Sequence, residues 1–220
     1  MAKYFFCNKF VNEMFLGCNI KNLFGSWESR ALYYASVCFR HGYCIQIIAL
    51  ILVIMGDFIN VLVSKGNSNL IPEKDNLYGQ FVGEWDFEWV DNQGTTGERH
   101  VQGEWIFAWV LEGTAIQDVF ICPSRKARIK DYQPDAAYAT AVRMYNPNTE
   151  AWDILYTELG GATQLEGKRE GNRIVQTEIN EKNIQWVFSE ITTTSFRWQR
   201  MVKRPDGTWE TEAELFAVRR

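Results

Sequence analysis

Histidine is scarce in this 220-residue chain, and several motifs that enzymes depend on are missing. The chain has two histidines and five cysteines, and no two cysteines are spaced as CxxC. Only His41 lies near Cys38 and Cys44, so the spacing does not predict a zinc site. A GxSxG nucleophile elbow, a P-loop and a dinucleotide fingerprint are also absent. The sequence therefore predicts no metal, no cofactor and no nucleophilic triad, and it leaves catalytic residues unknown.

An excess of positive charge is also lacking. The formal net charge is −4 at pH 7, whereas a surface that binds a phosphate backbone needs a basic face. The composition therefore argues against nucleic acid as a partner. The charge is uneven, because residues 1–54 carry five Lys and Arg against two Asp and Glu, and four of the five cysteines. This contrast indicates that residues 1–54 and the rest of the chain were shaped by different constraints.

A long hydrophobic run is the next absence. Residues 45–56 read IQIIALILVIMG, which is shorter than the ~20 residues that a bilayer span needs. The stretch 45–63 reaches that length only by including Asp57 and Asn60, and a central Asp costs about 2.5–3.5 kcal/mol on insertion scales. No small-residue cleavage site follows, so the run is not a normal secretory signal. Membrane anchoring through 45–63 remains an alternative hypothesis.

Met55 is our preferred first residue of the natural protein. Asp57 then occupies an N-cap or first-turn position of a short helix, and Gly66 provides a stop signal. The apolar face of this helix would hold Phe58, Ile59, Leu62 and Val63. Residues 1–54 would be a non-domain N-terminal extension, 55–76 the short helix and a linker, and 77–220 the folded domain. The protein would be cytoplasmic under this reading, and membrane-anchored if 45–63 spans a bilayer.

Two near-copies of one octapeptide open the folded region. GEWDFEWV covers 83–90 and GEWIFAWV covers 103–110, and each alternates aromatic residues with smaller or polar ones. This period of two predicts two half-buried strands, each with Trp, Phe and Trp on one face. The opposite face carries Asp86 and Glu88 in the first copy but Ile106 and Ala108 in the second. We therefore expect the two segments to be neighbouring strands of one sheet. The short helix would cover the outer face of the second strand, which is the less polar of the two.

Hairpins follow in series from Tyr138. Alternating segments flank the turns NPNT, Gly171–Asn172, TTTS and PDGT, which contain the residues that tight turns need. About ten short strands with hairpin-length links close most simply into a single antiparallel up-and-down β-barrel, which removes exposed edges. A sandwich is the alternative, but it would require longer crossovers.

The blocks FVGEWDFEW, GEWIFAWVLEG, QDVFICPSR and MYNPNTEAWDI, in this order, carry a family resemblance. They resemble the lipocalin-like, or calycin, barrels and, more narrowly, an uncharacterised bacterial family of unknown function. The resemblance covers residues 55–220 and implies a barrel with an internal cavity, without an established activity. It also implies structural roles for Gly83 and Trp85, with Arg200, Arg219 or Arg220 as the cation over the Trp85 ring.

Aromatic and charged residues of the expected strands are the candidate ligand contacts. An arginine on an interior face would need a carboxylate or a ligand anion, and Asp118, Glu158 and Glu178 are possible partners. Strand register is not determined by the sequence, so each candidate is either core filler or a ligand contact. The candidates are Trp105, Trp109, Arg143, Tyr145, Tyr156, Glu158, Trp198 and Arg200.

Three functions are compatible with such a barrel. The favoured hypothesis is non-catalytic binding of a small apolar or amphipathic, possibly anionic, molecule in the interior. The second is a metal-independent barrel enzyme, of the decarboxylase, cyclase or isomerase type, that uses Tyr, Arg and Glu. The third is a structural or partner-binding domain with a filled barrel. Fold analogy does not choose among them, and the oligomeric state is not predicted.

Overall fold

The computed structural model describes residues 57–128 and 136–220. The chain divides into two compact units, residues 1–58 and 59–220, and the fold described below is that of the second unit. The predicted extension 1–54 and the run 45–56 lie outside the described residues, so the start at Met55 and the membrane anchor stay predictions. Within the described ranges, no helix is long and apolar enough to cross a membrane.

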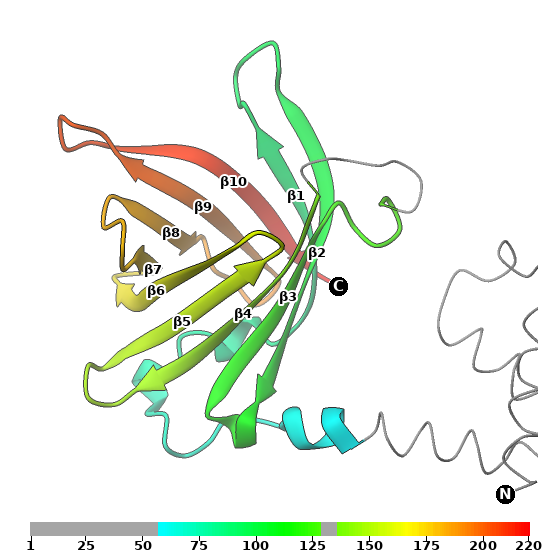
Figure 1. The fold of residues 1–220 in the computed structure, drawn as a ribbon, viewed down its shortest axis with the longest axis vertical. Helices are drawn as coiled ribbons and strands as arrows, with labels where there is room; N and C mark the ends of the chain where they lie inside the picture. Colours follow the sequence, from blue (N-terminus) through cyan, green and yellow to red (C-terminus); the bar gives the residue numbers. More distant parts are fainter. Residues whose placement is uncertain (1–56, 129–135) are drawn as a thin grey trace, which may run out of the picture. The chain divides into compact units, whose positions relative to one another are not determined.

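Ten strands form one closed barrel (Figure 1). Each strand pairs antiparallel with its sequence neighbour, and the first pairs with the last to close the sheet. The predicted single up-and-down barrel of about ten strands is therefore confirmed. The strands are β1 (Gly83–Asp91), β2 (Arg99–Val110), β3 (Ala115–Cys122), β4 (Ala137–Asn146), β5 (Ala151–Glu158), β6 (Gly161–Glu170), β7 (Arg173–Glu178), β8 (Ile184–Ser189), β9 (Ser195–Lys203) and β10 (Trp209–Arg219).

The two octapeptide copies form the neighbouring strands β1 and β2. Trp85 lies opposite Trp105, and Gly83 lies opposite Phe107. The aromatic residues of both copies occupy the inward face, as the period of two predicted. Because the strands are antiparallel, the copies run in opposite directions. Trp89 therefore lies near one rim of the barrel, and Trp109 lies near the other.

The segment before β1 plugs one end of the barrel, which we call the closed end (Figure 1). It contains two 3-10 turns, η1 (Glu73–Asp75) and η2 (Gly79–Phe81). Tyr78 and Phe81 are fully buried, and the Phe81 ring centre lies 4.8 Å from that of Phe188. At the same end, η3 (Leu111–Gly113) joins β2 to β3. The opposite rim, where β1 ends and β2 begins, is the open end.

A short helix over residues 57–62 precedes the plug, in agreement with the predicted N-terminal helix. Its apolar side chains do not cover β2, because Phe58 is 71% exposed and Ile59 is 54% exposed. The expected cover over Ile106 and Ala108 was therefore wrong. The segment attaches to the barrel through its backbone instead, since Val63 bridges Val110 and the Ser64 amide donates to the Trp109 carbonyl at 2.8 Å.

Candidate functional site

The closed end is held by hydrogen bonds to Trp85 and Arg219. The Trp85 Nε1 donates to the Phe81 carbonyl at 2.7 Å. The Arg219 guanidinium lies 4.1 Å from the Trp85 ring centre and donates to the carbonyls of Val82, Gln80 and Thr193 at 2.7 to 2.8 Å. Of the three cations that the resemblance offered, Arg219 is the one over the ring. Trp85 and Arg219 thus form a cation–π pair whose hydrogen-bond donors all have acceptors, and this pair stabilises the closed end.

Gly83 leaves space for the Arg219 guanidinium. Its φ of +126° is one that L side chains rarely adopt, and a Cβ here would lie 2.8 Å from the Arg219 Nη1. A larger residue would therefore strain the backbone and displace the guanidinium.

Three predicted candidates lie at this plugged end. The Tyr145 hydroxyl donates to the Asp75 carboxylate at 2.9 Å, beside Trp152, whose Nε1 donates to the Asp75 carbonyl at 2.8 Å. Trp109 packs so closely against Gly79 that a Cβ at that glycine would lie 2.8 Å from the indole. Arg143 lies one layer further in. Tyr145 and Trp109 therefore contact the plug.

Arg143 and Asp118 form a buried ion pair where the plugged half of the barrel meets the open half. Each side chain is 2% exposed, and the Arg143 Nη1 donates to the Asp118 Oδ2. The other oxygen, Oδ1, accepts from the Ala141 amide at 3.3 Å. The guanidinium lies 5.1 Å from the Tyr78 ring centre and 5.6 Å from that of Phe107. Burial raises the pKa of the Tyr78 phenol, which stays protonated at neutral pH. The arginine charge is thus neutralised within the protein.

An aromatic wall surrounds the interior above this pair. Neighbouring rings touch at centre distances of 4.9 to 6.4 Å, and the contacts are mostly edge-to-face. Aromatic pairs of this geometry add to simple area burial. All members project from inward-facing strand positions. The aromatic wall consists of Trp89, Trp105, Phe120, Tyr156, Trp186 and Trp198.

A pocket of about 230 Å³ opens above the aromatic wall. Trp89 and Phe120 form part of its lining, together with Val101, Cys122, Pro123 and Ala137. At its rim, Arg99 is ion-paired with Asp91. The pocket is thus largely apolar on its inner side and charged where it meets solvent, which is the common arrangement of a small-molecule site.

Several buried polar atoms of the barrel interior, including the Tyr78 hydroxyl in the plug, have no hydrogen-bond partner among the described residues. The indole Nε1 atoms of Trp105 and Trp198 are two of them, although these residues are only 5% and 6% exposed. Both amide atoms of Gln176, which is 0% exposed, are also unpartnered, as is the Arg143 Nε. Natural interiors pair nearly all such groups. The unpartnered indole N–H groups of Trp105 and Trp198 indicate a place for a polar group that the protein itself does not supply.

The remaining candidates lie nearer the rim. Arg200 is partly exposed and paired with Glu212, and Glu158 is exposed at the end of β5. The Trp186 Nε1 donates to Glu178 at 3.0 Å. Burial, and after it the Glu158 carboxylate, raises the pKa of the Tyr156 phenol. These groups form the polar upper edge of the aromatic wall.

Sequence reasoning missed three residues of this site, namely Trp89, Phe120 and Gln176. The alternation that placed Trp85 and Phe87 on the inner face also applies to Trp89, so the sequence pattern could have identified Trp89 as a site residue. Gln176 alternates with the buried Ile174 in the same way. Its polarity in a buried layer was the available signal.

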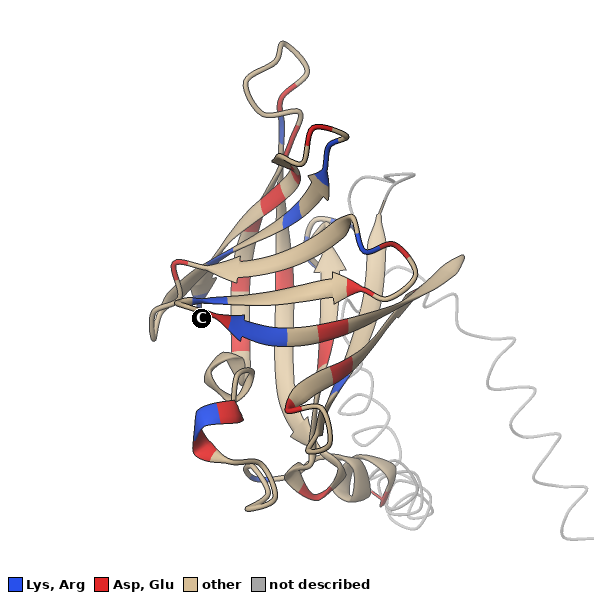
Figure 2. Cartoon of the chain, turned by 90° about the vertical axis from the view of Figure 1, so that its left-hand side faces the viewer, with Lys and Arg blue, Asp and Glu red and all other residues tan. Residues whose placement is uncertain are grey.

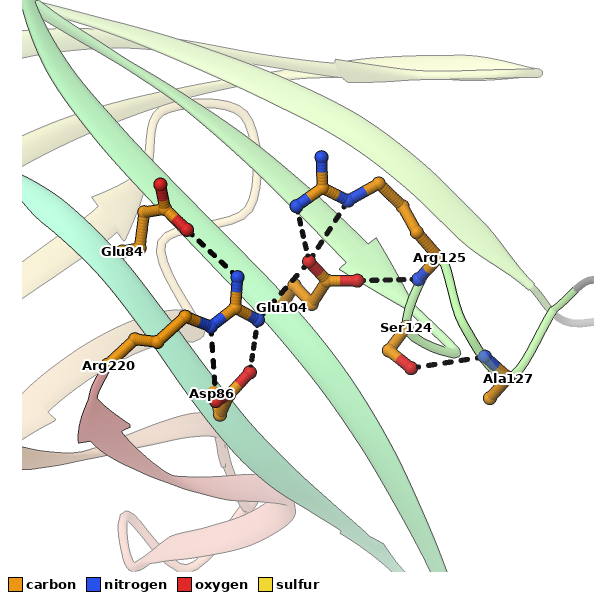
Figure 3. A network of polar contacts seen from close by, with 7 residues as sticks. All are labelled: Glu84, Asp86, Glu104, Ser124, Arg125, Ala127 and Arg220. Carbon is orange, nitrogen blue, oxygen red and sulfur yellow. Dashed lines mark hydrogen bonds and ion pairs between the residues drawn. The ribbon is translucent and has the colours of Figure 1, made fainter. Parts of the chain in front are cut away.

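An ionic network on the outer face joins the two ends of the barrel (Figure 3). Glu104 is 5% exposed and accepts from the Arg125 backbone amide at 2.6 Å and from its guanidinium at 2.6 and 3.0 Å. Arg220 reaches the same carboxylate at 3.3 Å and also contacts Glu84 and Asp86. Burial opposes ionisation of Glu104, but the hydrogen bonds from Arg125 outweigh it and hold the Glu104 pKa below its ordinary value.

A larger hollow, of about 300 Å³, borders β1, β9 and β10. Its lining is polar, and its charged groups are already paired, Arg204 with Glu210 and Arg197 with Glu214. Basic and acidic positions alternate over short distances on the face shown in Figure 2. This hollow offers a ligand less apolar surface than the pocket above the aromatic wall.

A closed antiparallel barrel with one plugged end and a pocket at the other has the architecture of a lipocalin-like barrel. No protein-family model and no curated protein matches the chain, so the narrower bacterial family resemblance has no support.

The solved structures that are similar to the chain include the following two. One is a redesigned β-barrel, with 13% sequence identity and a TM-score of 0.34, covering 64% of this chain and 92% of that one. The other is the S-type phycobiliprotein lyase CPES from Guillardia theta, with 10% identity and a TM-score of 0.39, covering 67% and 92%. Likenesses this low carry no argument about function.

Proposed function

We propose that the open half of the barrel binds a small amphipathic molecule, with its apolar body against the aromatic wall. The observation that carries this proposal is the pair of buried, unpartnered indole N–H groups of Trp105 and Trp198. The rings of these two residues pack against Phe120 and Trp89, which line the pocket. Leaving a buried donor without an acceptor costs about 1–3 kcal/mol. A ligand that supplies an acceptor removes this cost at two sites at once.

The apolar part of the ligand provides the larger share of the affinity. Transfer of apolar surface from water is worth roughly 25 cal/mol per Å², so burying about 200 Å² contributes about 5 kcal/mol before the cost of association. Trp89 and Phe120 present ring faces and edges to the pocket. Rigid aromatic side chains lose little conformational freedom on binding, which favours a preformed site.

The two alternative functions have weaker support. Catalysis would need a carboxylate available to act as a base. Both oxygens of Asp118 are engaged, by the Ala141 amide and by Arg143. Asp91 of the pocket lining is ion-paired with Arg99, and neither Glu158 nor Glu178 lines the pocket. A filled barrel describes the closed half, where Tyr78 and Phe81 occupy the interior. It does not account for the pocket or for the unpartnered donors above them.

Titration with N-phenyl-1-naphthylamine, a neutral apolar fluorophore, tests the proposal. We expect saturable fluorescence enhancement with the full chain. Ala137→Trp places a bulky ring at a position that lines the pocket, and it should weaken binding at least tenfold. The matched control is Tyr138→Trp, which adds an indole at the neighbouring, 56% exposed position on the outer face and should leave binding unchanged.

Thermal unfolding followed by circular dichroism verifies that both variants are folded. Absence of saturable binding to the folded wild-type chain would overturn the proposal. Equal affinity in folded Ala137→Trp and wild type would place the probe elsewhere on the molecule and would overturn it as well.

A further inference from the structure

The unpartnered atoms of the barrel interior also define the chemistry of the ligand's polar group. Trp105 and Trp198 contribute indole N–H groups, which can only donate, and the Arg143 Nε likewise only donates. Gln176 adds an amide that can donate twice and accept through its oxygen. The two indoles are pure donors, so a ligand group that fits them must accept hydrogen bonds.

These donors come from different walls but lie close together. The Trp105 and Trp198 rings are 6.4 Å apart between centres, with an interplanar angle of 82°. Gln176 lies next to this pair of rings through Trp186. Trp186 is the register partner of Gln176 across β7 and β8, and its ring centre lies 5.7 Å from that of Trp198. The Trp105 and Trp198 rings are therefore neighbours in the barrel interior, and Gln176 is the register partner of the wall residue Trp186.

The charges of the barrel decide between an anionic and a neutral acceptor. Arg143, the most deeply buried cation of the described residues, is already neutralised by Asp118. Arg200 is paired with Glu212, and Arg99 at the rim with Asp91. Burying a further carboxylate or phosphate without its own counter-charge costs several kcal/mol.

Carboxylates beside the aromatic wall also disfavour an anionic ligand. Glu178 receives the Trp186 indole hydrogen bond, and Glu158 lies near the Tyr156 phenol at the rim. Asp91, a carboxylate of the pocket lining, already pairs with Arg99, so an anionic ligand would have to compete with it for that cation. An uncharged oxygen acceptor meets no such penalty.

We infer that the barrel selects ligands whose polar group is an uncharged carbonyl-type acceptor, such as a ketone, ester or amide, held by the indole N–H groups of Trp105 and Trp198. This inference rests on the binding function proposed above, and it replaces the anionic head that the sequence analysis allowed. Gln176 is the supporting donor, and the Asp118–Arg143 pair is the neutral floor beneath the carbonyl.

Displacement of bound N-phenyl-1-naphthylamine by two ligands of equal chain length tests the inference. We expect 2-dodecanone to displace the probe at a concentration at least tenfold lower than dodecanoate at pH 7.5. Trp198→Phe should weaken binding of the ketone about fivefold more than binding of the probe, which has no carbonyl, and this is the effect of one neutral hydrogen bond. Trp105→Phe should act in the same direction.

Trp186→Phe is the matched control, because it removes the same volume from a neighbouring indole that already has an acceptor in Glu178. If Trp186→Phe weakens the ketone as much as Trp198→Phe does, the donor role is overturned. If dodecanoate displaces the probe as well as or better than the ketone, the uncharged head is overturned while the binding function stands. If the probe itself does not bind, the proposed function fails first.

Discussion

The two halves of the barrel treat the same side chain in opposite ways. At the closed end, the indole N–H groups of Trp85 and Trp152 donate to the carbonyls of Phe81 and Asp75 at 2.7 and 2.8 Å. Further toward the open end, the indoles of Trp105 and Trp198, which are also buried, have no acceptor among the described residues. The Tyr78 hydroxyl in the plug is also unpartnered, so the contrast concerns the indoles. Those at the closed end have acceptors within the protein, and under the proposed function the other two gain one from a ligand.

This contrast arises from where the backbone carbonyls are. The closed end receives η1 and η2, whose last residues, Asp75 and Phe81, offer their carbonyl oxygens to the indoles of Trp152 and Trp85. In the middle of the barrel the backbone carbonyls are used by the strand ladder, so an inward indole depends on other side chains. Stability and binding are thus separated along the barrel axis.

Asp118→Asn should have the largest effect on the boundary between the halves. The change leaves the buried Arg143 guanidinium without a charged partner, which costs about 3–5 kcal/mol of unfolding free energy. Urea unfolding monitored by tryptophan fluorescence measures it. The double variant Asp118→Leu with Arg143→Met should recover most of the loss, because it removes both charges. A loss below about 1 kcal/mol in the single variant would contradict a desolvated pair.

Arg219→Met should weaken the closed half next. Three carbonyl hydrogen bonds and the contact with the Trp85 ring disappear, and we expect a loss of about 2–3 kcal/mol in urea unfolding. Binding of N-phenyl-1-naphthylamine by the variant that remains folded should be unchanged, because the open half is untouched. Arg204→Met, at an exposed ion pair with Glu210, is the control and should leave stability unchanged. Weakened binding in folded Arg219→Met would break the proposed separation.

A matched pair of substitutions compares the indoles directly. Trp85→Phe and Trp198→Phe remove the same volume, but only the first breaks a hydrogen bond. We expect Trp85→Phe to be the more destabilising by about 1 kcal/mol in the ligand-free protein. Equal losses would show that the Trp198 N–H finds an acceptor, such as an ordered water, and would weaken the distinction between the halves.

The barrel itself was predictable because its signal is local. Period-two alternation and turn residues such as Gly171–Asn172 specify strands and hairpins, and short links leave an up-and-down closure as the simplest topology. The expected helix was also found at 57–62. Its supposed role as a cover failed because helix periodicity describes one face of a segment and does not say what that face contacts.

The site was predictable in part. Inward orientation followed from alternation, but the height of a side chain along the axis depends on register and strand direction, which the residues alone do not determine. Trp105 and Trp109 belong to one octapeptide copy, yet the first lies in the aromatic wall and the second against the plug. The partner of Arg143 was confined to three carboxylates, and only the diagonal placement across β3 and β4 identifies Asp118.

Glu104→Gln has the smallest expected effect and tests the connection between the halves. Glu104 binds Arg125, which follows the open end of β3, and Arg220, which follows the closed end of β10. We expect a loss of about 1 kcal/mol at pH 7, since an amide keeps an acceptor but not the charge. The folded-state pKa of Glu104 is lowered, so its contribution is complete above the ordinary value of 4.5 and is lost as the pH falls through the lowered pKa. Urea midpoints measured from pH 7 to pH 3 should therefore converge for wild type and variant only below about pH 4.5. A difference that is the same at pH 3 and pH 7 would mean that the carboxylate charge does not stabilise the network.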